Sequence, residues 1–164
     1  MVDGQQTMNR TELIAQYKDG YNQVAGALAG IAPVELDYPA VPGKWTCREI
    51  VHHLADSEMR SAIRLRRLLA EDNPQIIGYD QEEYARKLHY RTRPIEPSLL
   101  ALQAARESTS QLLDSMTEAD WQRKGTHTES GEYSPEAWLR IYASHAHNHA
   151  DQIRRNRKLF REAR

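Results

Sequence analysis

Two histidines one helical turn apart, His145 and His149, have the spacing that binds a metal ion. They lie in a stretch whose apolar residues recur with helical periodicity. At roughly 100° per residue, His149 falls near the middle of the apolar face and His145 on its flank, whereas His147 points away and is predicted at the surface. Two imidazoles four residues apart on a helix can hold one metal ion. The alternative is a pair of hydrogen-bonded core histidines, because a buried imidazole needs partners for its nitrogens.

A second helical stretch carries the adjacent histidines His52 and His53 on opposite flanks of its apolar stripe. Periodicity alone does not choose between them. Asp56 and Ser57 follow three and four residues after His53 on the same side, which favours His53. Asp56 could accept the second N–H of an imidazole or stand close to a metal-bound water, and it is our candidate for a general base or proton shuttle. The alternative is that His53 and Asp56 form an ordinary pair, three residues apart, on the helix surface.

Four other side chains lie near these positions. Arg60 and Arg64 share the His53 side of their helix, and we favour surface positions for them over contacts with an anionic substrate. Tyr142 lies on the inward face and is predicted to be a core residue rather than a catalytic acid. Gln152 keeps to the face of His149.

Helical periodicity also dominates the rest of the chain, and no alternating apolar runs support strands. Long helices are predicted over residues 11–28, 46–70, 98–116 and 134–160, short ones over 81–88 and 118–122, and a polar loop over 124–131. Thr46 and Glu49 form a capping box that starts the second long helix, with Trp45 packed as a lid over its start. Ser134 and Pro135 start the last helix.

These elements predict an all-α fold, a four-helix bundle with a long crossover connection between its second and third helices. Bundles of this kind place metal and ligand sites between facing helices. The length of 164 residues argues for a single domain, residues 1–164.

The amino-acid composition limits the kinds of molecule and site that we expect for this chain. The chain has 22 Lys and Arg against 23 Asp and Glu, a net charge of −1, which gives no electrostatic reason to bind nucleic acid. The single cysteine, Cys47, excludes disulfides within the chain and a cysteine-rich zinc site, and we interpret it as structural. Residues 1–6 have no signal-peptide pattern and no apolar run approaches the roughly 18 residues of a membrane span, so a cytoplasmic protein without membrane partners is predicted.

Five segments together resemble the DinB/YfiT-like family of metal-dependent hydrolases, and the likeness extends over nearly the whole chain. The segments are Gly43-Lys44-Trp45-Thr46, Val51-His52-His53-Leu54-Ala55-Asp56-Ser57, Glu71-Asp72-Asn73-Pro74, Glu129-Ser130-Gly131-Glu132 and Ile141-Tyr142-Ala143-Ser144-His145-Ala146-His147-Asn148-His149.

The resemblance implies three metal-binding histidines. The ligand from the second helix is the histidine directly before a leucine, which is His53, and the last helix supplies His145 and His149. The family's fold is a four-helix bundle with up-down-down-up connectivity, and many of its members are homodimers. The resemblance thus makes the choice between His52 and His53 that periodicity left open.

Three histidine ligands would bind one divalent metal, zinc or nickel, and leave a position open for water. The function implied is a metal-dependent hydrolase that acts on a small-molecule substrate. The same ligands would also suit a metal-dependent thiol S-transferase that uses a low-molecular-weight thiol such as bacillithiol or mycothiol. A non-catalytic, metal-stabilised binding bundle is the third alternative.

Overall fold

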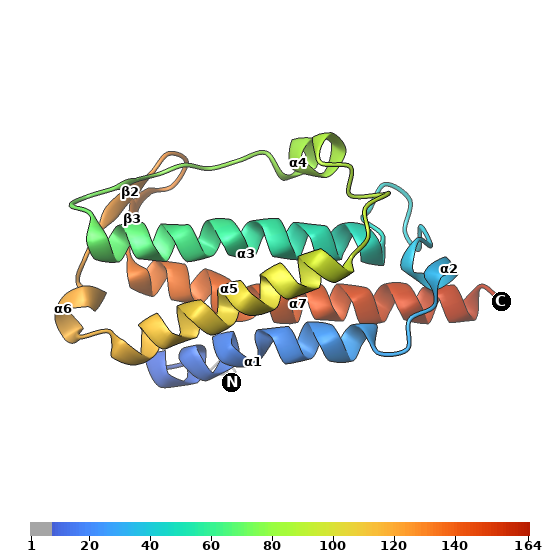
Figure 1. Ribbon diagram of the computed structural model, residues 1–164, viewed down its shortest axis with the longest axis horizontal. Helices are drawn as coiled ribbons and strands as arrows, with labels where there is room; N and C mark the ends of the chain where they lie inside the picture. Colours follow the sequence, from blue (N-terminus) through green and yellow to red (C-terminus); the bar gives the residue numbers. More distant parts are fainter. Residues whose placement is uncertain (1–7) are drawn as a thin grey trace, which may run out of the picture.

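Four long helices pack side by side in the computed structural model, which describes residues 8–164 (Figure 1). They are α1 (Arg10–Leu28), α3 (Cys47–Ala70), α5 (Glu96–Ser115) and α7 (Pro135–Glu162). In Figure 1, α1 and α7 run in one direction and α3 and α5 in the other, and a long crossover leads from α3 back to the start of α5. The predicted up-down-down-up four-helix bundle is therefore confirmed. The predictions for residues 1–6 lie outside the described residues.

The helix starts follow from local capping. The Thr46 hydroxyl accepts the Glu49 backbone N–H at 3.3 Å, and the Glu49 carboxylate accepts the Thr46 N–H at 2.9 Å. This capping box begins α3 where the sequence predicted it. Ser134 caps α7 by accepting the Ala137 N–H at 3.1 Å. No helix in residues 8–164 is both long and apolar enough to cross a membrane.

A small sheet at one end of the bundle is the main departure from the all-α prediction (Figure 1). Its strands are β1 (Gln75–Ile76), β2 (Gly125–His127) and β3 (Gly131–Tyr133), with β1 parallel and β3 antiparallel to β2. The predicted polar loop over 124–131 is thus wrong in part, because it contains β2 and the turn before β3. Strands of two or three residues are too short to show an alternating pattern.

Three short helices complete the described part of the chain: α2 (Pro33–Leu36), α4 (Gln81–Lys87) and α6 (Glu118–Trp121). The last two match predicted short helices, and α2 was not predicted. In Figure 1, α2 lies beside the start of α3 and α4 lies over the first half of α3, both away from the sheet.

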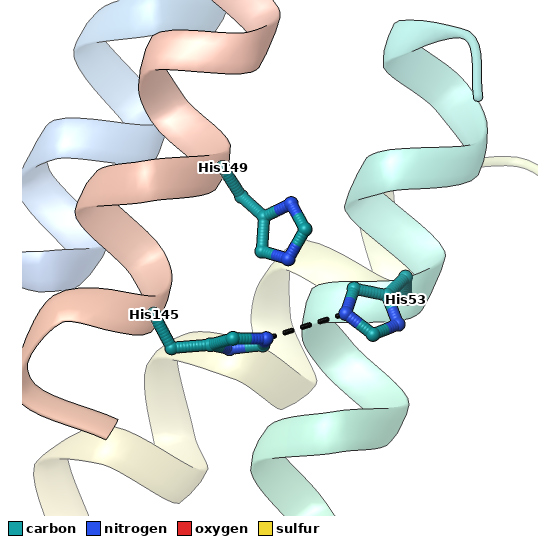
Figure 2. A group of neighbouring side chains, drawn as sticks. All are labelled: His53, His145 and His149. Carbon is teal, nitrogen blue, oxygen red and sulfur yellow. Dashed lines mark hydrogen bonds between the residues drawn. The ribbon is translucent and has the colours of Figure 1, made fainter. Parts of the chain in front are cut away.

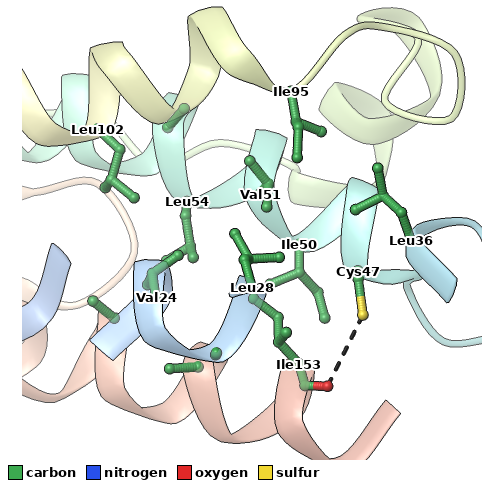
Figure 3. Packing of buried hydrophobic residues seen from close by; sticks show 14 residues of the cluster. Val24, Leu28, Leu36, Cys47, Ile50, Val51, Leu54, Ile95, Leu102 and Ile153 are labelled. Atoms are coloured by element: carbon green, nitrogen blue, oxygen red, sulfur yellow. Dashed lines mark hydrogen bonds between the residues drawn. The ribbon is translucent and has the colours of Figure 1, made fainter. Parts of the chain in front are cut away.

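The interior consists of two apolar clusters with a polar layer between them. Figure 3 shows one cluster, in which residues of α1, α3, α5 and α7 meet around Leu54 and Ile153. The other surrounds Trp138 nearer the sheet. Cys47 belongs to the first cluster, with its sulfur 4.0 Å from the Ile153 carbonyl oxygen (Figure 3). Burial raises the pKa of the Cys47 thiol to about 11, which supports its structural role.

A buried ion pair links the helices between the two clusters. Arg106 of α5 donates to the Glu58 carboxylate at 2.7 Å, and these side chains are 2% and 0% exposed. The guanidinium also donates to the backbone carbonyls of Tyr17 and Tyr142, so it joins α1, α3 and α7. The Tyr17 hydroxyl donates to the second oxygen of Glu58.

Gly20 of α1 makes room for the Arg106 side chain. We therefore expect a Gly20→Ala change to destabilise the protein, although alanine usually stabilises a helix. A methyl group there would lie 2.7 Å from Nη2 of Arg106 and 2.9 Å from Cβ of Ala146. Alanine is favoured over glycine in a helix by about 1 kcal/mol, but overpacking costs about 1–3 kcal/mol. We expect Gly20→Ala to lower the free energy of unfolding, measured by urea denaturation.

The matched control lies in the same helix. A methyl group at Gly26 would meet nothing within 4 Å. Gly26→Ala is therefore expected to stabilise the protein by about 0.5–1 kcal/mol. Equal stabilisation by both substitutions would contradict the tight contact at Gly20.

Candidate metal centre

His53 of α3 and His145 and His149 of α7 converge between the two helices (Figure 2). Each offers one ring nitrogen, and these three atoms lie within 4.8 Å of one another. Nε2 of His53 is 3.3 Å from Nε2 of His145. Two nitrogens bound to one tetrahedral ion at about 2.05 Å would be about 3.3 Å apart. The structure thus brings together the three predicted ligand residues with a spacing that fits one ion.

All three rings are electrostatically suited to be metal ligands. Burial lowers the pKa of His53 to about 3, and it lowers the pKa of His145 well below its usual value. The pKa of His149 is lowered by the same cause. A buried imidazole loses the hydration that stabilises its cation, so the neutral form with a free lone pair is favoured. Neutral imidazole is the form that binds a metal.

The orientation of His149 is set by Gln152, one turn further along α7. The Nδ1–H of His149 donates to the Gln152 side-chain oxygen at 2.7 Å. This bond places the proton on Nδ1 and leaves the lone pair on Nε2, the form in which Nε2 can bind an ion. The sequence indicated Gln152 as a neighbour of His149, because it follows three residues later on the same helix face.

His145 provides a further test of whether a metal fits. Its Nδ1 is buried and has no hydrogen-bond partner among the described residues, so its polar contact is made through Nε2 at the centre of the cluster. The Nε2 atoms of His145 and His53 face each other at 3.3 Å, and an ion between them would bind both lone pairs. Three nitrogen donors are the ligand chemistry of zinc and nickel.

The other two histidines of these helices have different partners. In His52, Nε2 donates to the Arg93 carbonyl at 3.1 Å, and Nδ1 is 2.8 Å from the Ser98 hydroxyl. Both nitrogens of His52 are therefore used. His147 is half-buried and donates to the Gln16 carbonyl of α1 at 2.9 Å, so it is a contact between helices rather than the surface residue predicted.

Asp56 lies one turn after His53 and is half-buried. Its Oδ2 accepts a hydrogen bond of 2.5 Å from the hydroxyl of Tyr90, which is 1% exposed. Burial and the neighbouring carboxylate raise the pKa of Tyr90, which keeps this phenol a donor. The described contacts include no hydrogen bond from a histidine to Asp56, so its suggested bond to the second N–H of an imidazole is not made, and its partner is Tyr90 instead. Its catalytic role stays a prediction.

Arg60 and Arg64 are engaged with the crossover. Both donate to the Ile77 carbonyl, Arg60 also to the Tyr84 hydroxyl and Arg64 to the Tyr142 hydroxyl. They tie the segment after β1 to α3. Tyr142 is 4% exposed with its ring 5.8 Å from that of His145, which confirms the predicted core position.

Trp45 covers the centre from the loop before α3. Its ring centroid is 4.6 Å from that of His53, and its indole N–H donates to the Glu82 carboxylate of α4 at 3.3 Å. The predicted lid thus lies over His53 itself. The contact with α4 could not be found from the sequence, because the two residues are 37 positions apart.

The sequence pattern of the DinB superfamily matches residues 16–153, which include all three converging histidines. The chain belongs to this superfamily. Proteins similar to it include one of Geobacillus thermodenitrificans, 36% identical over 148 residues that cover 90% of this chain and 83% of that one. Another, from Bacillus mycoides, is 35% identical over 140 residues that cover 85% and 80% of the two chains. Both carry the name "putative metal-dependent hydrolase".

A solved structure of the DinB type also matches the fold. YfiT from Bacillus subtilis superimposes with a TM-score of 0.84 and 27% sequence identity, over 99% of this chain and 93% of that one. It is described as a probable metal-dependent hydrolase with an unusual four-helix bundle topology. The four-helix bundle of this chain therefore has a known counterpart.

Proposed function

We propose that this DinB protein is a metal-dependent hydrolase in which His53, His145 and His149 hold one divalent ion, zinc or nickel. The observation that carries the proposal is the convergence of three neutral imidazoles within 4.8 Å. Three protein ligands are typical of catalytic rather than structural zinc sites. The names of the relatives support the same class of activity. A homodimer and a cytoplasmic location stay predictions.

The chain's own residues would transfer the proton, orient a ligand and shield the site from solvent. When bound, the ion would lower the pKa of a coordinated water to about 7 and polarise a substrate carbonyl. Asp56 would accept the proton of the attacking water, with Tyr90 holding its carboxylate in place. Gln152 would keep His149 oriented, and Trp45 would shield the His53 side from solvent.

Metal analysis and turnover together test this function. Purified protein is expected to hold one zinc or nickel ion per chain and to hydrolyse an activated ester such as para-nitrophenyl acetate. A chelator should abolish turnover, and reloading with metal should restore it. Turnover that requires bacillithiol or mycothiol would contradict hydrolysis and indicate thiol S-transfer. A loaded protein inactive with esters, amides and thiols would be a non-catalytic binding bundle.

The general-base assignment gives a separate prediction. Asp56→Asn preserves the size of the side chain and an oxygen for the Tyr90 hydroxyl. Because loss of a general base typically costs 10²–10⁴-fold, we expect kcat to fall by about 100-fold with unchanged metal content. Steady-state kinetics and metal analysis check this. Asp151→Asn is the control, since Asp151 is exposed and paired with Arg154. Equal kcat for Asp56→Asn and the wild type would refute the assignment.

A further inference from the structure

A cleft of 330 Å³ opens beside His149, where the loop before α3 faces α7. Trp45, Gln152 and Asn156 line it together with the cationic residues Lys44 and Arg155. Pockets that bind small molecules span about 300–1,000 Å³, so the volume suits a small substrate. The cleft adjoins the metal centre through His149 itself.

Lys44 and Arg155 differ from the other cationic side chains of residues 8–164. Each of the others contacts a carboxylate, another oxygen or an aromatic ring. Lys44 and Arg155 make no such contact within the described part of the chain, and both are exposed. Two cations without ion-pair partners among the described residues therefore line the cleft that contains a candidate ligand histidine.

Three other polar side chains of this wall already have partners. Gln152 accepts from His149, and Asn156 donates to the Trp45 carbonyl at 3.0 Å. Among residues 8–164, Glu82 is the one acidic residue lining the cleft, and its carboxylate accepts the Trp45 indole N–H. With two cations against one anion, the lining has a positive balance. What it lacks is an anion that both Lys44 and Arg155 can bind.

We propose that the cleft binds the carboxylate end of an acyl substrate, an ester or amide whose acyl chain ends in a carboxylate. The inference rests on the proposed hydrolase function for the placement of the reacting carbonyl at the histidines. Arg155 follows His149 by six residues, about 9 Å along the helix axis, which separates the two ends of the substrate. A guanidinium fork and a lysine ammonium are suited to a carboxylate.

Equilibrium binding tests the carboxylate preference without relying on turnover. Monomethyl suberate carries an ester and a carboxylate at opposite ends of an eight-carbon chain, long enough for this separation, and dimethyl suberate is its neutral counterpart. NMR titration of metal-free and zinc-loaded protein is expected to show about tenfold tighter binding of the monoester. Lys44→Gln and Arg155→Gln should each weaken binding of the monoester about fivefold and leave binding of the diester unchanged. Added salt should weaken binding of the monoester but not of the diester.

Arg154→Gln is the matched control, because Arg154 neighbours Arg155 but is paired with Asp151. It is expected to bind both esters as the wild type does. Equal binding of the two esters, or wild-type binding of the monoester by both cleft variants, would overturn the proposal even if the protein holds a metal ion. A carboxylate preference in protein that takes up no metal would instead support the cleft and contradict the hydrolase.

Discussion

His149→Ala is expected to abolish tight metal binding, with the largest effect of any single substitution at the centre. His149 supplies one of only three converging ring nitrogens, and its Nδ1–H bond to Gln152 directs the other nitrogen to the centre. Loss of a side chain that merely orients a ligand lowers metal affinity by about 10–100-fold. Loss of the ligand should exceed that range. Metal content after dialysis and competition with a chromophoric chelator measure the effect.

Two comparisons make this result specific. His147→Ala removes a histidine from the same helix whose ring bonds to the Gln16 carbonyl outside the centre, so full metal binding is expected. Gln152→Ala should give an intermediate loss of about tenfold, since it frees the ring of His149 without removing it. Far-UV circular dichroism verifies the helix content of each variant. Metal at wild-type stoichiometry and affinity in His149→Ala would refute the proposed ligand set.

The inward positions of His145 and His149 were predictable because one helix contains both residues and its own apolar stripe. The choice between His52 and His53 was not available from periodicity, since both flank the stripe of α3. What separates them in space is the segment before α5 together with the first turn of α5. Arg93 and Ser98, more than 40 residues away, take both nitrogens of His52. Only the resemblance to a family could supply that information from the sequence.

Other features depended on contacts between distant segments and escaped prediction for the same reason. The strand β1 pairs with β2 across about 50 residues, as in Gln75 with Thr126. Neither strand is long enough to show its own pattern. Trp45 was placed near the start of α3, but its position on His53 depends on α4, whose Glu82 holds the indole. The buried partner of Glu58, Arg106, likewise lies on another helix, 48 positions further along the chain.

The buried pair of Glu58 and Arg106 yields the largest expected effect on stability. Glu58→Ala would leave the Arg106 guanidinium charged and without its carboxylate in the interior, where the pair is at most 2% exposed. Breaking a buried ion pair by removing one partner costs about 3–5 kcal/mol, because the remaining charge is uncompensated. We expect the free energy of unfolding, measured by urea denaturation of the metal-free protein, to fall by about that amount.

A double substitution separates the cost of the unpaired charge from the value of the pair. Replacing both residues, Glu58→Leu with Arg106→Met, removes the stranded charge, and exchange of a buried pair for apolar groups is often neutral or stabilising. The double variant should therefore be more stable than Glu58→Ala. Glu71→Ala, which breaks the exposed pair with Arg67, should change stability little. If Glu58→Ala unfolded at the wild-type urea concentration, the arginine would have found other partners, and the pair would not hold the two apolar clusters together.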